Sequence, residues 1–382
     1  MIAPVEGGRN VLIFSPWIAL GNHVVTTPML RALGQSPMVD RIGIVCNREG
    51  ARFFNSVPYI DQMFELESLS DNGSRTPRSV ELNYDLARRL LQERYDSVIV
   101  LSGSERIYAE LIHSYSMPSF KIREGNSSRL DLIVGNDPWA FPFLQAEYRE
   151  QYLARVAFTH DVNVTYPYTH RGYIGRLLMD FLVPLGIESG NVRPEVFSKE
   201  EDKRFVDGYL KENGVESGDF LIGLHLGGRN NIWPAGEFSR FIQMMEERFH
   251  GQIYGRKIKY FANFTGEELF LYTNLASTLK LLGVDACVIP AHPANDLGTT
   301  AEFAGKWSYA VSPETGFAHF LQALDIPGTI IYRDVQWMES WLCDEPGIRV
   351  RPVVSRVGDV SRVPAEQVFL ETLEGIKFWA SR

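Results

Sequence analysis

The chain has 382 residues, a length typical of two domains, and its 45% hydrophobic content is enough for two sizeable cores. Its formal net charge of −9 argues against a general nucleic-acid-binding protein, which needs excess lysine and arginine to replace phosphate counterions. The three cysteines form no CxxC pair and no His/Cys cluster, so we expect no metal site and a reducing compartment.

The N-terminus lacks the basic and apolar regions of a signal peptide. No apolar run approaches the roughly 20 residues that a membrane-spanning helix needs. We therefore expect a cytoplasmic protein.

In the first half of the chain, short apolar runs alternate with amphipathic stretches. The predicted strands cover residues 11–14, 42–46 and 97–101, and the predicted helices cover 28–33, 50–56 and 80–94. Thr27 is the predicted N-cap of the first helix, with Pro28 at its first position and Gly34 just past its end. The tract 120–169 is rich in proline, asparagine and aromatic residues, so we expect it to be irregular.

The second half repeats the alternation. The predicted helices cover 199–213, 235–248, 267–282, 316–324 and 365–380, and the predicted strands cover 221–224, 258–261, 286–289, 310–311 and 329–332. This order is typical of two α/β domains with parallel sheets, linked near residues 188–195. Ligands of such sheets bind beyond the carboxyl ends of the strands, so we expect the site in a cleft between the domains.

A first strand-to-helix loop offers a glycine and two hydroxyl groups. Gly21 permits close approach of the backbone to a ligand, and Thr26 and Thr27 stand beside the expected helix N-terminus, where an anion is favoured. A purely structural turn is the alternative.

A second loop reads HLGGRNNIWP. Gly227 and Gly228 free backbone N–H groups to face an oxyanion, and Arg229 could form a fork to a diphosphate. The alternative is a turn with a solvated arginine and a packed Trp233.

A third loop reads SPETGFAH. Ser312 or Thr315 is expected to cap the following helix, and Gly316 to allow close ligand approach. Glu314 could accept hydrogen bonds from sugar or ribose hydroxyls. His319 either faces the cleft or is a packing residue.

In this order and at these separations, the motifs resemble those of the ADP-heptose–lipopolysaccharide heptosyltransferases, glycosyltransferase family 9. Residues 20–30 resemble its L-G-D-x-x-x-T-x-P-x-L motif, 57–61 its N-P-Y-I-D step, 225–234 its H-P-G-x…K-x-W-P stretch, 314–319 its D-T-G-x-x-H motif and 363–368 the entry to its terminal helix. The resemblance spans nearly the whole chain and is weakest over 102–170.

The resemblance implies a GT-B fold, in which two Rossmann-like parallel-sheet domains face a cleft. It implies an acceptor-side domain over 1–190, a nucleotide-sugar-binding domain over 196–362, and a terminal helix, 363–382, that packs back on the N-terminal domain. Residues on the family's donor-binding motifs are Gly21, Thr26, Thr27, His225, Gly227, Gly228, Arg229, Asn231, Trp233, Glu314, Thr315, Gly316 and His319.

The implied activity is inverting, metal-independent transfer of heptose or a related sugar from a nucleotide diphosphate sugar, ADP-linked in this family. The implied acceptor is a glycan, a lipid-linked saccharide or another molecule, at the inner membrane face in bacterial lipopolysaccharide biosynthesis. No further cofactor, no nucleic acid and at most peripheral membrane contact are expected. Candidate acceptor contacts are Arg88, Arg89, Arg94 and the aromatic tract 139–143, with a solvated helix face and core burial as the alternatives.

Three departures from the family bear on catalysis. The loop aspartate implied to be the base is Asn22, whose amide cannot take up a proton, and the motif lysine is Asn231. The motif aspartate is Glu314. His23, next to the vacated position, is the first candidate for a replacement base, with Glu314 and His225 as alternatives. A catalytically silent sugar-nucleotide-binding or partner protein is therefore the competing hypothesis, and a sugar-nucleotide epimerase, whose motifs the chain does not match, is a third.

Overall fold

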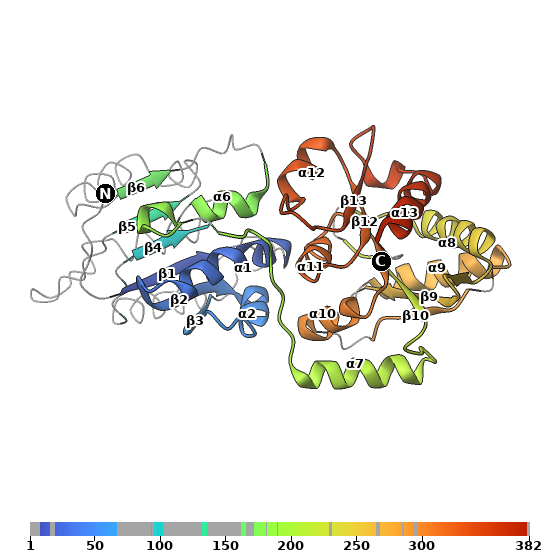
Figure 1. Ribbon diagram of the computed structural model, residues 1–382, viewed down its shortest axis with the longest axis horizontal. Coiled ribbons are helices and arrows are strands. Elements are labelled where there is room, and N and C mark those ends of the chain that lie inside the picture. The colour runs from blue at the N-terminus through green and yellow to red at the C-terminus, as the bar shows by residue number, and fades with distance from the viewer. Residues whose placement is uncertain are drawn as a thin grey trace, which may run out of the picture. The chain divides into compact units, whose positions relative to one another are not determined.

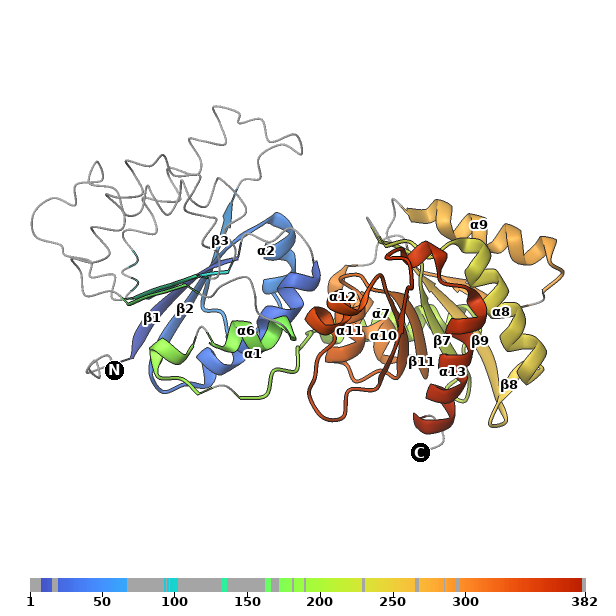
Figure 2. The same cartoon turned by 90° about the horizontal axis from the view of Figure 1, so that it is seen from above.

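The computed structural model describes residues 8–15, 20–66, 93, 95, 97–101, 132–135, 162–165, 172–180, 182–188, 190–228, 231–264, 268–284, 286–292 and 296–379. The chain divides into two units (Figures 1 and 2). The N-terminal unit comprises Met1–His170 with Gly175–Val192, and the C-terminal unit comprises Arg171–Ile174 with Arg193–Arg382. Each has its own parallel sheet, in agreement with the predicted α/β class.

The sheet of the N-terminal unit has the order β3-β2-β1-β4-β5-β6, and all its described pairs are parallel. The strands are β1 (Arg9–Ser15), β2 (Val39–Asn47), β3 (Gln62–Leu66), β4 (Ser97–Val100), β5 (Leu132–Gly135) and β6 (Val162–Thr165). The three predicted strands are confirmed as β1, β2 and β4. The tract expected to be irregular contains β5 and β6, so that prediction is wrong there; four-residue strands leave little periodicity to detect.

Helix α1 (Leu20–Gln35) begins eight residues earlier than predicted and carries Pro28 in its interior. A proline inside a helix leaves the carbonyl four residues before it without its usual N–H partner. Here that carbonyl belongs to Val24, and it accepts a hydrogen bond of 2.7 Å from the Thr27 hydroxyl. The Thr-Pro pair therefore continues the helix instead of opening it, which corrects the predicted N-cap.

Three shorter helical segments complete the described N-terminal unit and its exit. They are α2 (Arg48–Phe54), α6 (Ile174–Asp180) and the 3-10 turn Val183–Leu185. Asn47 caps α2 by accepting a hydrogen bond of 2.8 Å from Gly50 N. The predicted helix 80–94, its arginines 88, 89 and 94, and the aromatic tract 139–143 lie outside the described residues.

The sheet of the C-terminal unit has the order β10-β9-β7-β11-β12-β13, with β8 antiparallel to β9. Its strands are β7 (Phe220–His225), β8 (Gln252–Ile253), β9 (Arg256–Asn263), β10 (Val288–Pro290), β11 (Tyr309–Pro313), β12 (Gly328–Tyr332) and β13 (Val350–Val354). The five predicted strands of this half are confirmed. Strands β8 and β13 were not predicted.

Helices cover both faces of this sheet (Figure 2). They are α7 (Glu200–Glu212), α8 (Ala235–Phe249), α9 (Leu269–Leu281), α10 (Leu297–Gly305), α11 (Ala318–Ala323), α12 (Val335–Trp341) and α13 (Ala365–Trp379). The terminal helix α13 packs on α8, β12 and β13 of its own unit. Its expected contact with the N-terminal domain stays a prediction. None of the described helices is both long and apolar enough to cross a membrane.

Candidate functional site

The order of the C-terminal sheet reverses between β7 and β11, because the chain runs outward from β7 to β10 and then returns beside β7. Leu224 pairs with Val311 across these parallel strands, so the loops that follow them leave the same edge of the sheet. Such a switch point is where open α/β sheets bind ligands. The loops touch: a Cβ atom on Gly228 would lie 2.8 Å from Thr315 Cγ2.

The Gly227–Gly228 backbone already faces an anion. Gly228 has φ +145°, a conformation open to glycine, and its N–H donates to Glu268 Oε1 at 2.9 Å. A Cβ atom on Gly227 would lie 2.1 Å from Glu268 Oε2, so both glycines are required for this approach. The sequence predicted the oxyanion of a ligand here, which stays a prediction, and it did not indicate Glu268; a glycine and two acidic residues shortly after a predicted strand were a usable signal for that side chain.

Glu314 lies at the centre of a hydrogen-bond network. Its side chain is 6% exposed, and Oε2 accepts from Asn231 Nδ2 at 2.9 Å and from the Trp337 indole N–H. Asn231 Nδ2 also lies 2.9 Å from the Glu314 carbonyl oxygen. Burial raises the pKa of the Glu314 carboxyl, while the Trp337 bond, the Arg333 charge and the Asn231 bond act in the opposite direction. Asn231 and Glu314, predicted separately, thus form one unit, which Trp337 completes.

His225 ends β7 and is held neutral by its surroundings. Its ring stacks on Phe317 with centroids 4.6 Å apart, and Nδ1 lies 3.0 Å from Asn263 Nδ2, the last residue of β9. Burial lowers the His225 pKa to about 4, against the opposing charge of Glu268. His225 therefore positions two loops and is a weak base at neutral pH.

His319 is a packing residue in this structure. Its ring lies 5.3 Å from the Trp341 ring, Nδ1 lies 3.4 Å from Gln322 Nε2, and burial lowers its pKa to about 4. The expected cap of the following helix is corrected: α11 begins after Phe317 with no side-chain cap, and Ser312 Oγ donates to the Pro313 carbonyl instead. Thr315 Oγ1 accepts from Phe317 N at 3.2 Å, which fixes the turn containing Gly316.

Trp233 belongs to the core of the C-terminal unit. It is 1% exposed, its indole N–H donates to the Val363 carbonyl at 2.8 Å, and its ring meets Phe238 edge-on at 4.6 Å. A direct ligand contact is therefore not what this side chain provides. Arg229 lies outside the described residues.

The predicted residues of the N-terminal unit gather in the first two turns of α1. Gly21, Thr26 and Thr27 are buried, and Thr26 Oγ1 donates to the Asn22 carbonyl at 2.7 Å. Both threonine hydroxyls thus donate to the helix backbone, a role that differs from the predicted one beside a helix N-terminus. Asn22 is half-buried.

His23 is fully buried between α1 and α2. Its ring lies 5.1 Å from Phe54 and 6.2 Å from Phe53, and burial lowers its pKa to about 4. Neither ring nitrogen has a hydrogen-bond partner among the residues that the structure describes. This environment is that of a packed side chain and gives a weak base at neutral pH.

Solved structures provide the comparison for this fold. The chain is similar to a glycosyl transferase family 9 protein from Veillonella parvula, with a TM-score of 0.73, 15% identity, and coverage of 98% of this chain and 99% of that one. The E. coli ADP-heptose lps heptosyltransferase II gives a TM-score of 0.65 at 12% identity, covering 97% of this chain and 99% of that one. The E. coli heptosyltransferase WaaC with ADP gives a TM-score of 0.61 at 16% identity, covering 96% of this chain and 99% of that one.

This chain has the fold of the family 9 glycosyltransferases. The predicted GT-B fold and the structural resemblance to heptosyltransferases are thereby confirmed. No protein-family model matches the chain, and no curated protein matches it.

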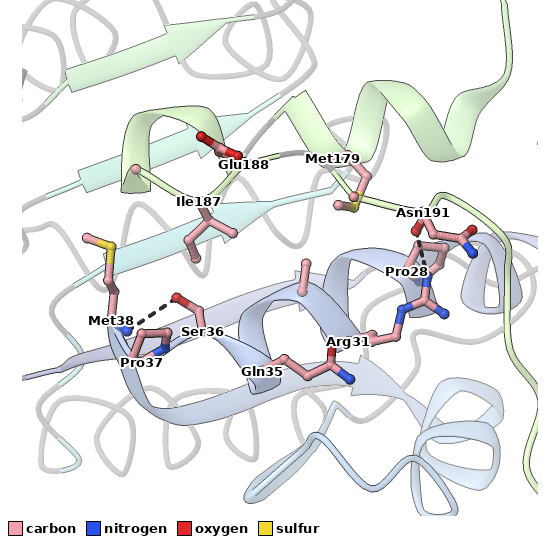
Figure 3. A pocket seen from close by; sticks show the side chains of 13 residues that line it. Pro28, Arg31, Gln35, Ser36, Pro37, Met38, Met179, Ile187, Glu188 and Asn191 are labelled. Carbon is pink, nitrogen blue, oxygen red and sulfur yellow. Dashed lines mark hydrogen bonds between the residues drawn. The ribbon is translucent and has the colours of Figure 1, made fainter.

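A groove of about 420 Å³ lies in the N-terminal unit (Figure 3). Pro28, Arg31, Met38 and Met179 line it together with the segment around Asn191. Arg31 Nη2 donates to the Asn191 carbonyl at 2.5 Å and so ties this segment to α1. None of the predicted site residues lines the groove.

The three buried imidazoles predict an acid-sensitive fold. Each has a pKa near 4 when folded against an ordinary value of 6.5, so the unfolded chain binds more protons below pH 6.5. Stability should therefore fall as the pH falls from 6.5 towards 4, by up to about 1.4 kcal/mol per pH unit for each histidine. Urea unfolding between about pH 7.5 and 5 measures this.

His319→Gln should flatten that pH dependence, because it removes one of the three buried imidazoles. Equal slopes for wild type and His319→Gln would show that the folded protein binds a proton at His319.

Proposed function

We propose that this chain is an inverting, metal-independent glycosyltransferase that moves heptose or a related sugar from a nucleotide diphosphate sugar to a saccharide, a lipid-linked saccharide or another acceptor. The observation that carries the proposal is the Gly228 amide, which donates to a carboxylate at the switch point of the C-terminal sheet. An amide that receives an oxyanion there is suited to a diphosphate. The family 9 fold of the chain supports the choice of donor class.

In this proposal the diphosphate of the donor displaces the Glu268 carboxylate from the Gly228 amide and binds beside the turn at Thr315–Gly316. Arg229, which the sequence assigns to the same loop, is the proposed partner for its charge. These groups stabilise the negative charge that develops on the leaving diphosphate, the larger electrostatic contribution to such a transfer. Glu314 acts mainly by position, because its carboxylate accepts from Asn231 and Trp337 and so fixes the second loop against the third. The ADP-linked donors of the heptosyltransferases make ADP the first nucleotide to test.

The acceptor hydroxyl must lose its proton to a general base, and the candidate bases among the described residues are weak. Asn22 stands where a carboxylate is implied, while His23 and His225 are buried with lowered pKa values. We propose that the chain works by positioning and leaving-group stabilisation, at a rate below that of an enzyme with a full base. The same observations favour the second candidate, a silent sugar-nucleotide-binding protein, which would bind donor without releasing sugar.

Isothermal titration with ADP, UDP, GDP and TDP tests the proposal. We expect one nucleoside diphosphate to bind, and Arg229→Ala to weaken its binding at least about tenfold, because a charge-assisted hydrogen bond contributes that much. Gly228→Ala and Glu314→Ala should also weaken binding, because the first displaces the backbone amide and the second releases the second loop from the third. The Gly228 variant also meets Thr315 and a strained φ. Gly236→Ala is the matched control, since a Cβ atom there contacts nothing within 4 Å.

If wild type binds none of the four diphosphates, the proposed function is contradicted. The similarity to the family 9 glycosyltransferases would then be one of fold alone. Binding without release of free sugar from the matching donor would favour the silent binder.

A further inference from the structure

Arg333 follows the carboxyl end of β12, one strand beyond Glu314. Strands β11 and β12 are parallel with Pro313 opposite Ile331, and Glu314 N donates to the Ile331 carbonyl at 2.8 Å. Arg333 and Glu314 therefore leave the sheet side by side, at the same edge as the Gly227–Gly228 loop. A charged side chain in this position is close enough to serve a ligand at the switch point.

The guanidinium of Arg333 is held by an aromatic ring. Its Cζ lies 3.8 Å from the centroid of the Trp337 ring, and the Trp337 indole N–H donates to Glu314 Oε2. Because Glu314 Oε2 also accepts from Asn231, a continuous set of contacts joins Arg333 to the loop after β7. Stacking on a ring face pre-orders the planar guanidinium and leaves its N–H groups directed outward in the plane, the geometry that binds phosphate oxygens.

Charge at this edge is otherwise sparse among the described residues. Asn231, at the position of the implied lysine, is neutral, and its Nδ2 group is taken by Glu314. In the described part of the C-terminal unit, two arginines or lysines lie within two residues of the carboxyl end of a strand, namely Arg333 and Arg356. Arg356 follows the edge strand β13, whereas Arg333 is adjacent to the switch point.

Arg333 is not withdrawn from solvent. Its side chain is 43% exposed, and its Nε lies 3.2 Å from Asp334 Oδ2, a carboxylate that also accepts from Trp337 N through Oδ1. This ion pair lies at Nε, so we assign ligand binding to the two Nη groups.

We propose that Arg333 binds the diphosphate of the donor through its Nη groups and supplies the positive charge that Asn231 does not. This inference rests on the proposed function, and it adds the Arg333–Trp337 pair as a determinant of affinity for diphosphate over monophosphate. Trp337 is the positioning residue, and Arg333 is the residue that touches the ligand.

Titration of the full chain with inorganic pyrophosphate, and with ADP, UDP, GDP, TDP and AMP, tests this. Arg333→Ala should raise the Kd for pyrophosphate and for the nucleoside diphosphate that wild type prefers by about tenfold to a hundredfold, the range of lost charge-assisted hydrogen bonds. The effect on the matching monophosphate should be smaller. Arg333→Lys keeps the charge without the planar fork, so its Kd values should lie between those of wild type and those of Arg333→Ala.

Arg356→Ala removes the same charge from the next strand end and should change each Kd by less than about twofold, as surface substitutions do. Unfolding curves of all variants verify that they are folded at the titration temperature. If wild type binds pyrophosphate and a nucleoside diphosphate and Arg333→Ala has the same Kd values, this inference is overturned while the proposed function stands. If wild type binds neither pyrophosphate nor any nucleoside diphosphate, the proposed function fails and this inference with it.

Discussion

Asn22→Asp is expected to increase sugar transfer by about 10²–10⁴-fold, the usual contribution of a general base. Position 22 is where the family motif implies a catalytic aspartate, and the asparagine there cannot accept a proton. The substitution fits its surroundings, because residue 22 is half-buried in the first turn of α1, where the helix dipole favours a negative charge. Release of sugar from the donor that the titrations identify is the measurement, first with water and then with candidate acceptors.

Two variants control for this gain. Asn22→Ala should show none of it, because it adds no base. His23→Phe, made in the Asn22→Asp background, should preserve it, because His23 packs against Phe53 and Phe54 and lacks exposure. If Asn22→Asp binds donor as wild type does yet releases no more sugar, position 22 does not face the acceptor, and the silent-binder hypothesis gains support.

Trp233→Ala should lower the free energy of unfolding of the C-terminal unit by about 3–5 kcal/mol, a large part of the 5–15 kcal/mol that stabilises a typical domain. The substitution empties a site that is 1% exposed and removes the donor to the Val363 carbonyl, which joins the loop before α8 to the segment before α13. Chemical unfolding followed by circular dichroism measures the loss. At a temperature where the variant is still folded, nucleotide affinity should stay close to that of wild type.

Ile232→Ala is the matched control for this stability effect. Ile232 precedes Trp233 in the chain and is 37% exposed, so its truncation removes little buried surface. A loss for Trp233→Ala as small as that for Ile232→Ala would contradict the core role of the indole. A loss of nucleotide binding by folded Trp233→Ala would restore the earlier prediction that Trp233 belongs to the donor site.

Glycine-rich loops were the most informative sequence signal for the site. Gly227 and Gly228 were predicted to face the oxyanion of a ligand because glycine frees backbone N–H groups, and that stays a prediction. What the structure shows is that the Gly228 amide donates to a carboxylate of the protein itself, that of Glu268. The pairing of Asn231 with Glu314 was beyond the reach of the sequence, because it depends on β11 lying beside β7. Trp337 left no signal, since its short helix α12 was not predicted.

The alternation of strands and helices, the two α/β halves and the order of the motifs could all be predicted from the residues alone. These follow from apolar periodicity and turn residues, which act over a few neighbours in the chain. The start of α1 already required more than a local rule: Thr27-Pro28 is typical of a helix start, yet the Thr27 hydroxyl satisfies the Val24 carbonyl and the helix continues through. Local propensity is a weak constraint that such a contact can override.

The availability of the polar side chains for chemistry depends on packing between distant parts of the chain and became visible in the folded protein. His23, His225, His319 and Trp233 are all compatible with a site by type and spacing, but burial against aromatic neighbours lowers the three imidazole pKa values and places the indole in the core. The physical reason is that burial and strand order arise from contacts between residues far apart in the chain. Desolvation, which sets the charge of a histidine, therefore cannot be read from the residues beside it.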